Sequence, residues 1–480
     1  MKQEPVLSSR KAAIRKLADD VAINRNKWIN KNKFFYREDY RYMRFLIPEG
    51  LRVLELGCGT GRLLAELKPS HGVGVDFSQN MIEVAKSGYP HLKFYVGDIE
   101  DVDFMSTLAG PFDVIVLSDT IGSLEDCQAT LFNLHRLCKA DTRIIIAYYS
   151  KIWEPLLTLA RAIGQKMPQE EQNALSTEDI TNLLSLADFD VVKREWRQLM
   201  PRKLLGLGIL VNRYLAPFPL IRRACLRNYV VARPIRDIKK RKPSATVLIP
   251  CRNERGNIEE AVQRIPKFCN DMEIFYVEGH SKDGTLEEIQ RVIAAYPKLD
   301  IKVIVQSGKG KGNAVREGFE RARGEILMIL DADLTMPPEA LPKFYDAIAS
   351  GKGEFINGSR LVYPMEKNAM RFLNYLANHT FSMLFTWLLN QRFTDTLCGT
   401  KVLSKKHYLK IAENRNYFGE FDPFGDFDLI FGAAKLNLKV VEIPITYASR
   451  TYGETQISRF KHGWLLLKMV IFAFRKLKAF

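Results

Sequence analysis

The 480-residue chain lacks the cysteine patterns of disulfide scaffolds and zinc sites. Its seven cysteines are scattered, odd in number and never spaced as C-x-x-C, which favours a reducing compartment. Long apolar runs are also missing. No stretch approaches the roughly 18–20 apolar residues that span a bilayer, and the opening residues lack the apolar core of a signal peptide. We therefore expect neither a secreted disulfide-rich protein nor a membrane-spanning one.

Acidic residues are outnumbered, 55 against 71 lysines and arginines, which gives a formal net charge of +16. Such a charge suits nucleic acid, anionic lipid or a phosphorylated substrate, and the charge alone does not choose among them. No nucleic-acid recognition motif is present in the sequence, so we expect no nucleic-acid partner.

Two separate series of short apolar runs alternate with helical patterns. The first contains RVLEL, GVGVD, KFYVG, FDVIVLS and RIIIAYY, between Arg52 and Tyr149. The second starts at Ser244 with ATVLIP, EIFYVE, KVIVQ and ILMILDAD. This alternation predicts parallel strands with crossover helices. The fold class is therefore α/β, with two Rossmann-like domains, and one or two charged helices are expected over residues 11–45.

The segment 197–242 between the two series is both apolar and basic, and Asp237 is its only acid. It can be a few packing helices with a solvated linker, or a surface that lies on anionic lipid. The C-terminal stretch Trp464–Phe474 is too short to span a bilayer and is interrupted by Lys468, so we predict an amphipathic interfacial helix there. We expect domains over 1–196 and 243–480, joined by a basic apolar linker over 197–242.

A glycine loop, VLELGCGTG, follows the first predicted strand and precedes a helix. Glycine allows the backbone to approach a ligand closely and to turn sharply. The next strand ends in Asp76, whose carboxylate can accept both hydroxyls of a ribose, and the third ends in Asp98 and Ile99, suited to an adenine amino group and ring. The loop differs from the dinucleotide pattern GxGxxG because its third glycine comes one residue early.

This arrangement resembles the class I S-adenosylmethionine-dependent methyltransferases over residues 30–195. The resemblance implies that the glycine loop meets the methionine part of the cofactor, that Asp76 holds the ribose and that Asp98 reads the adenine. The cofactor-binding residues that it implies are Glu55, Gly57, Gly59, Gly61, Asp76, Asp98 and Ile99.

The methyl acceptor is not indicated. Asp119, after the fourth strand, can be a general base or a helix cap, and the sequence favours neither. Tyr148, Tyr149 and Trp153 can line an acceptor pocket or belong to the core.

The stretch MILDADLTMPPE ends an apolar run with two aspartates, Asp331 and Asp333. Two like charges at the end of a buried strand suit a hard divalent cation, Mg²⁺ or Mn²⁺, which takes carboxylate oxygens and substrate phosphates. Such a metal stabilises charge on a leaving nucleoside diphosphate. Because a D-x-D pattern is common by chance, the surrounding motifs must show whether these two aspartates indicate a metal site.

Seven further motifs surround it: TVLIPCRNERGNIEEAV, VEGHSKDGT, SGKGKGNAVREGF, NGSR, TDTLCGTKVLSKK, FDPFGDFDLI and SRTYGETQISRF. In this order and spacing they resemble the GT-A family 2 glycosyltransferases, most closely the polyprenyl- or dolichyl-phosphate sugar transferases, over nearly all of residues 244–480. The resemblance implies a GT-A fold, a nucleotide-sugar donor and a lipid-phosphate acceptor.

The resemblance also implies site residues. Those for the nucleotide sugar are Pro250, Asn253, Glu254, Glu278, Lys311, Arg316 and Asp331. The metal ligands are Asp331 and Asp333, and the arginines that clamp the acceptor phosphate are Arg360, Arg371 and Arg450. Arginine suits that role through bidentate, charge-assisted bonds. Asp283 corresponds to a residue that orders the loop.

The family usually has Asp-Asp-Gly-Ser where this chain has Glu278-Gly279-His280-Ser281, so the nucleotide, UDP or GDP, stays open. A phosphate acceptor is already ionised, whereas a hydroxyl acceptor needs a general base. Asp426 and Asp428 stand where such enzymes often place the base, with helix capping as the alternative.

We therefore predict a bifunctional enzyme, a methyltransferase followed by a glycosyltransferase, peripheral on the cytoplasmic face of the membrane. The alternative is a glycosyltransferase for a non-lipid hydroxyl acceptor, with the methyltransferase domain as a non-catalytic scaffold.

Overall fold

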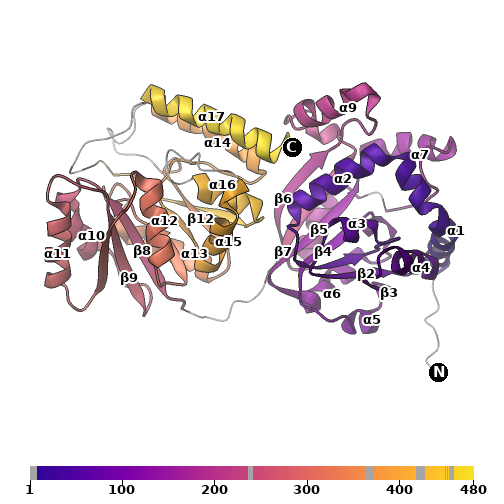
Figure 1. Cartoon of the computed structure of the whole chain (residues 1–480), viewed down its shortest axis with the longest axis horizontal. Coiled ribbons are helices and arrows are strands. Elements are labelled where there is room, and N and C mark those ends of the chain that lie inside the picture. Colours follow the sequence, from indigo (N-terminus) through magenta and orange to yellow (C-terminus); the bar gives the residue numbers. More distant parts are fainter. Residues whose placement is uncertain are drawn as a thin grey trace. The chain divides into compact units, whose positions relative to one another are not determined.

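The computed structural model describes residues 8–173, 175–235, 242–363, 372–417, 427–448, 450, 452 and 459–479, with backbone alone for 372–375 and 459–462. The chain forms two compact units, residues 1–236 and 237–478. Figure 1 shows each unit as a twisted sheet covered by helices. The two-domain α/β prediction is confirmed.

The first unit contains a seven-stranded sheet of order β3-β2-β1-β4-β5-β7-β6. The strands are β1 Arg52–Leu56, β2 His71–Asp76, β3 Lys93–Val96, β4 Phe112–Ser118, β5 Cys138–Tyr149, β6 Phe189–Arg197 and β7 Arg227–Pro234. β1 to β5 pair in parallel, whereas β7 is antiparallel to both of its neighbours. The five runs predicted in this region are confirmed as strands, and only β5 begins appreciably earlier than expected.

The helices of the first unit are α1 Ser9–Lys31, α2 Lys33–Leu46, α3 Arg62–Glu66, α4 Gln79–Gly88, α5 Val102–Ser106, α6 Cys127–Asn133, α7 Glu154–Ala162, α8 Thr177–Leu186 and α9 Leu207–Leu210. The charged helices expected over 11–45 are α1 and α2. α6 and α8 bury Leu131, Ile180 and Leu184 against one face of the sheet. Residues of β1 alternate between faces, so Leu54 and Leu56 join that core and Glu55 points to the opposite side.

The linker predicted over 197–242 differs from the structure. Its residues 227–234 form β7, which is buried along its whole length between β5 and β6 and therefore belongs to the first sheet. β7 extends the first unit to residue 236, and the connection 198–226 is an excursion between β6 and β7.

The second unit contains a seven-stranded sheet of order β10-β9-β8-β11-β13-β12-β14. The strands are β8 Ala245–Cys251, β9 Met272–Glu278, β10 Asp300–Val305, β11 Ile326–Ile329, β12 Phe355–Ser359, β13 Lys401–Ser404 and β14 Val440–Pro444. β13 is antiparallel to both β11 and β12, and the other pairs are parallel. The four predicted runs are confirmed as β8 to β11.

The helices of the second unit are α10 Ile258–Arg264, α11 Thr285–Ala295, α12 Lys311–Arg321, α13 Leu341–Ala349, α14 Phe372–Leu389, α15 Lys405–Glu413, α16 Phe427–Lys435 and α17 Arg459–Leu477. α10, α11 and α13 supply Val262, Ile289 and Phe344 to the main core. α17 packs along α14, where Trp387 meets Phe474 with ring centroids 5.6 Å apart (Figure 1).

Two expectations from composition can be compared with the described part of the chain. All seven cysteines are free and buried. Among the described residues no helix has both the length and the apolar character that crossing a bilayer requires.

Candidate active sites

The first unit has a cavity of about 160 Å³ at the carboxyl ends of β1 to β4. Its wall includes Gly57 and Gly59 after β1, Asp76 at the end of β2 and Asp98 and Ile99 after β3. It also includes the segment 118–120, at the end of β4, and the segment 167–172. The sheet thus brings together side chains that lie far apart in the sequence, because parallel strands end at one edge.

Asp76 ties the glycine loop to the turn after β2. Its carboxylate accepts hydrogen bonds from the Gly59 N–H at 2.8 Å and the Ser78 N–H at 3.0 Å. Burial raises the pKa of Asp76 above the usual value for an aspartate. The buried carboxylate therefore fixes the loop and lines the cavity.

Two residues of the implied cofactor set lie outside the cavity wall. The Glu55 carboxylate accepts from the Leu64 N–H at 3.0 Å, and burial raises its pKa to about 8. Gly61 has φ +73°, and a Cβ there would lie 2.6 Å from the Phe94 ring. Both residues support the loop through its helix and the neighbouring strand.

Asp98 already has partners in the described structure. One oxygen accepts from the Glu100 N–H at 2.9 Å, and the other forms an ion pair with Lys11 of α1, which also pairs with Glu100 at 2.8 Å. An adenine amino group would therefore share this carboxylate with Lys11.

α1 forms one wall of the cavity, a role that the sequence analysis did not assign. The side chains on that wall are spaced by three and four residues: Lys11, Ile14, Ala18, Val21 and Arg25. The Arg25 guanidinium lies over the glycine loop, since a Cβ added to Gly59 would be 2.8 Å from Arg25 Nε. Among the described residues its hydrogen-bond partner is Met167 Sδ at 3.8 Å, so no carboxylate neutralises this cation directly.

Asp119 belongs to a buried ionic cluster. It has φ +59° and pairs with Arg227 of β7, which is fully buried and also donates to Asp39 of α2 at 3.0 Å and to Ser118 Oγ at 2.9 Å. The Asp119 carboxylate, which lines the cavity, thus has the Arg227 guanidinium as a fixed counter-charge. The sequence left Asp119 open between a base and a helix cap. In the structure Asp119 pairs with Arg227, which belongs to a strand within the segment predicted as a linker, and this contact does not decide between the two roles.

The three aromatic residues near the end of β5 have different surroundings. The Tyr148 hydroxyl donates to Thr177 Oγ1 at 2.8 Å. Tyr149 stacks on Phe35 with centroids 5.6 Å apart, and the Trp153 indole N–H donates to the Ala224 carbonyl at 2.8 Å. The described contacts therefore give all three a packing role.

In the second unit Asp331 follows β11 and meets the first residue of α12. The Lys311 ammonium lies 2.6 Å from Asp331 Oδ1. A Cβ added to Gly399 would lie 1.8 Å from Asp331 Oδ2, so this approach requires glycine. The motif SGKGKG and the motif TDTLCGT therefore meet at the first aspartate of the pair.

Asp333 meets a second cation. Arg450 Nη2 lies 2.7 Å from Asp333 Oδ2, and Arg450 Nη1 lies 3.4 Å from Glu254 Oε1. Asp333 Oδ1 accepts from the Thr335 hydroxyl at 2.8 Å. Arg450 thus connects the loop after β8 with the second aspartate, and it brings three predicted site residues together.

The loops after β8 and β9 are joined by side-chain bonds. The Asn253 amide oxygen accepts from the Lys282 N–H at 2.9 Å. Glu278 accepts from the N–H groups of His280 and Ser281 at 3.1 and 2.6 Å, and Asp283 accepts from Arg255 N at 3.2 Å. The carboxylate that replaces the usual aspartate pair therefore closes its own turn. Pro250 lies in β8 opposite Val277 of β9.

Arg360 is held by a residue that the sequence analysis missed. Its Nε and Nη2 donate to the two oxygens of Asp395 at 2.6 and 2.8 Å, and Asp395 is fully buried. The pair is bidentate, and it orients the planar guanidinium. Asp395 stands in the quoted motif TDTLCGT, so its position was available as a signal. Arg371, also predicted to clamp phosphate, lies outside the described residues.

Asp428 and Arg316 lie together. Arg316 Nε is 3.2 Å from Asp428 Oδ2, and Arg415 Nε is 3.5 Å from the same oxygen. Asp428 lines a small hollow with residues of α15 and α16. Among the described residues its ion-pair partners are thus arginines, and neither is one of the cations beside Asp331 and Asp333. Asp426 lies outside the described residues.

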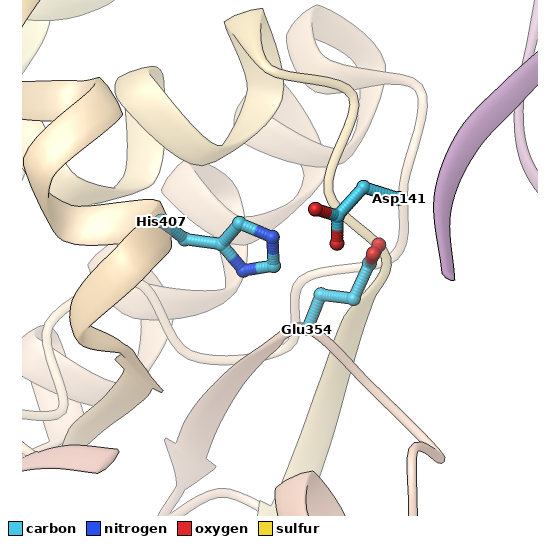
Figure 2. Close-up of side chains that lie close together, drawn as sticks. All are labelled: Asp141, Glu354 and His407. Atoms are coloured by element: carbon cyan, nitrogen blue, oxygen red, sulfur yellow. The ribbon is translucent and has the colours of Figure 1, made fainter. Parts of the chain in front are cut away.

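Figure 2 draws Glu354 and His407, which belong to the second unit, and Asp141, which belongs to the first. Glu354 accepts from the Lys439 N–H at 2.9 Å. Glu354 and His407 together offer two ligand atoms, which is fewer than a structural metal site takes. We therefore assign no metal to them.

Both halves of the chain match family models. Residues 31–194 match a methyltransferase domain, and residues 246–406 match glycosyl transferase family 2. A dolichol-phosphate mannosyltransferase of Pyrococcus furiosus is 33% identical over 44% of this chain and 58% of that protein. A low-salt glycan biosynthesis hexosyltransferase of Haloferax volcanii is 29% identical over 48% and 53%. The chain thus spans little more than half the length of these two relatives.

The solved structures that match part of the chain include a methyltransferase of Thermotoga maritima described as a possible histamine N-methyltransferase. It is 19% identical, covers 46% of this chain and 99% of its own, and has a TM-score of 0.36. A magnesium protoporphyrin IX methyltransferase of Synechocystis is 16% identical, covers 47% and 100%, and has a TM-score of 0.35. One family match lies before β7 in the sequence and the other lies after it. The chain is therefore a fusion of a methyltransferase domain with a family 2 glycosyl transferase domain.

Proposed function

We propose that the second unit transfers a sugar from a nucleotide sugar, UDP- or GDP-linked, to a lipid phosphate. The observation that carries the proposal is the double pairing at the end of β11. There Lys311 faces Asp331 and Arg450 faces Asp333. Two carboxylates and two cations, which come from three separate segments, make a site that can exchange its internal ion pairs for those of a bound diphosphate and cation.

The donor set fits a divalent metal. Asp331 and Asp333 offer carboxylate oxygens two residues apart, the ligands that Mg²⁺ and Mn²⁺ prefer. Such an ion, when bound, stabilises the negative charge of the departing nucleoside diphosphate. Lys311 and Arg450 then serve the phosphate oxygens, since each is within ion-pair distance of the aspartates.

A lipid phosphate is the acceptor that best suits Arg360 and Arg450. Two relatives, from Pyrococcus furiosus and Saccharomyces cerevisiae, are named dolichol-phosphate mannosyltransferases. Arg360 presents a guanidinium oriented by Asp395, and a guanidinium of this kind suits a phosphate monoester. A phosphate is already ionised, so no general base is required. This fits a site in which Asp428 is paired with Arg316 and Arg415.

The lipid acceptor places the reaction at a membrane surface. α17 exposes Trp464, Leu467 and Ile471 at helical spacing, with Lys468 among them, in keeping with an interfacial helix. We propose a peripheral enzyme at an anionic membrane on its cytoplasmic side. The free cysteines support the compartment, because such thiols persist where the environment is reducing.

For the first unit we propose methyl transfer from S-adenosylmethionine to an acceptor of the same pathway. Gly57, Gly59, Asp76 and Ile99 line the cavity, which supports this proposal. Arg25 adds a cation beside the glycine loop, where the carboxylate of the methionine part would lie.

The glycosyl transfer is tested with purified full-length protein, UDP- and GDP-sugars, and a polyprenyl phosphate. Product should form with Mg²⁺ or Mn²⁺ and stop in EDTA. Asp333→Ala should lose at least about two orders of magnitude in turnover, the scale of one such electrostatic contact. Glu339→Gln, which removes a carboxylate from an exposed pair with Arg264 in the same unit, is the control and should keep full activity. Full wild-type activity in excess EDTA would refute the metal site, and transfer only to a hydroxyl acceptor would refute the lipid phosphate.

A further inference from the structure

Two neighbouring segments of the first unit expose an unusual amount of aliphatic surface. α7 and its flanks present Ile152, Leu156, Leu159 and Ile163, each between 57% and 69% exposed, at the spacing of one helical face. The excursion between β6 and β7 presents Leu204, Leu205, Leu207, Leu210 and Leu220. We call these nine side chains the aliphatic surface.

The two segments lie beside one another. The Trp153 indole, at the start of α7, donates to the Ala224 carbonyl at 2.8 Å, and Arg202 donates to Gln165 Oε1 at 3.0 Å. Hydrogen bonds therefore join the two segments at both ends of α7. The exposed leucines and isoleucines form one region of the first unit, and exposed apolar regions of this kind mark interaction sites.

The excursion between β6 and β7 is held in place by specific contacts. The buried Asn212 amide accepts from the Met200 N–H at 2.9 Å and donates to the Met200 carbonyl at 2.8 Å. A Cβ on Gly208 would lie 2.0 Å from the Arg202 carbonyl oxygen, so the backbone is closely packed there. These contacts fix the segment that carries the leucines.

The tip of the excursion is strained. Leu204 and Leu205 have φ values of +37° and +52°, in the left-handed region that bulky side chains avoid. Strain of this kind persists where the surrounding structure imposes it, and it is concentrated at functional positions. Here the strained conformation leaves the Leu205 side chain fully exposed, where it gains nothing in water.

The charge around the aliphatic surface is predominantly positive. The sequence contains no aspartate or glutamate from Trp196 to Arg236. The exposed cations Lys151, Arg202, Lys203 and Arg223 border the leucines and isoleucines. The one exposed acid on α7, Glu154, is paired with Arg161 at 2.6 Å. A partner for this surface must therefore be apolar at its centre and anionic at its edge.

We infer that the aliphatic surface docks the methyltransferase domain on an anionic lipid bilayer. Aliphatic side chains enter the acyl boundary while arginine and lysine meet the headgroups. A second copy of the chain fits poorly, because a two-fold interface would place these cations against their own copies. The inference rests on the proposed function, which gives the chain a lipid acceptor, but it assigns a separate surface to the other catalytic domain.

The test uses full-length protein and vesicles of phosphatidylcholine, alone or mixed with phosphatidylglycerol. We expect Leu205→Asp combined with Leu159→Asp to weaken binding to the mixed vesicles at least about tenfold. The reason is that two aliphatic side chains which would enter the bilayer are lost. Leu186→Asp changes an exposed leucine of α8, outside the aliphatic surface, and should bind like the wild type. Lys203→Glu combined with Arg223→Glu should weaken binding to the mixed vesicles by at least about fivefold and leave neutral vesicles unaffected.

Because α17 can also bind vesicles, hydrogen exchange of the full chain locates the contact. We expect the amides of residues 152–163 and 204–215 to be protected by mixed vesicles. Protection confined to 459–479, or unchanged binding of the leucine variant, would overturn the inference. Protection of 204–215 that rises with protein concentration in the absence of lipid would instead indicate a second copy. Glycosyl transfer to acceptor in detergent should be equal in all variants, so failure of the proposed function is seen separately.

Discussion

Lys311 Nζ lies 2.6 Å from Asp331 Oδ1, and this contact joins the start of α12 to the end of β11. Burial acts to raise the pKa of Asp331, but Lys311, Lys401 and Arg360 together outweigh burial and lower the pKa. Because the folded-state pKa is below the unfolded one, the pair stabilises the fold above about pH 4, and this stabilisation is lost as the pH falls further. A bound cation would take over the same task.

Lys311→Met should therefore lower the free energy of unfolding by about 1–2 kcal/mol in EDTA, since both side chains are partly exposed. Mn²⁺ with the matching nucleoside diphosphate should restore most of that loss, because the ion replaces the missing counter-charge. Thermal melts under the two conditions provide the measurement. Lys309→Met, an exposed lysine two residues earlier, should behave like the wild type in both. An equal deficit with and without Mn²⁺ would show that Lys311 does not share its site with a metal.

Arg25 should recognise the carboxylate of S-adenosylmethionine. Arg25→Met is expected to weaken S-adenosylhomocysteine binding about 10- to 100-fold, the range of one hydrogen bond to a charged group. It should leave 5′-methylthioadenosine, which lacks the carboxylate, unaffected. Asp76→Asn should weaken both ligands. Calorimetry on the full-length protein measures this, and Lys27→Met, an exposed lysine on α1, is the matched control. If Arg25→Met weakens both ligands equally, Arg25 only supports the fold.

Glu55 should make the stability of the first unit depend on pH. Its folded-state pKa is about 8 because of burial, and its unfolded value is near 4.5. Between these values the folded state holds a proton that the unfolded state has released, so stability falls as pH rises, by up to about 1.4 kcal/mol per pH unit. Glu55→Gln keeps an acceptor for the Leu64 N–H and should remove this decline. Urea unfolding from pH 5 to 8 measures the difference, and the exposed Glu49→Gln serves as control. Parallel curves for the wild type and Glu55→Gln would contradict the assignment.

Asp395 should act through Arg360. Asp395→Ala leaves a buried guanidinium without its counter-charge, so we expect a loss of about 3–5 kcal/mol in unfolding free energy. Arg360→Lys keeps the charge but not the planar fork, and it should raise the KM for the lipid phosphate about tenfold while the KM for the nucleotide sugar stays constant. Steady-state kinetics with each substrate varied in turn give both values.

The control for that prediction is Arg264→Lys. Arg264 forms a bidentate pair with Glu339 at 2.8 and 3.1 Å on the surface, so its replacement should change neither KM nor stability by more than about 0.5 kcal/mol. A matching rise in both KM values for Arg360→Lys would place Arg360 in the donor site and not the acceptor site.

Local sequence determined the strands and the residues at their carboxyl ends. Buried parallel strands read as continuous apolar runs, and the residue that follows each run lies at the edge where ligands bind. For that reason the places of Gly57, Asp76, Asp331 and Asp333 at strand ends could be predicted without a structure. The pattern that predicts β11 and the two aspartates after it is only a few residues long. Such a short pattern can be recognised in the sequence without knowing the fold.

Tertiary structure decided what no local pattern contains. β7 lies between β5 and β6, against the order of the chain, so its membership in the first sheet depends on pairing with a strand formed some eighty residues earlier. Arg25 and Arg227 reach their partners through a helix and a strand whose sequences only indicate amphipathic or apolar segments. The same holds for the exposed leucines of the excursion. A basic, apolar segment reads alike whether it packs inward or faces outward, and only the packed fold, by burying β7 and leaving Leu205 exposed, separates the two.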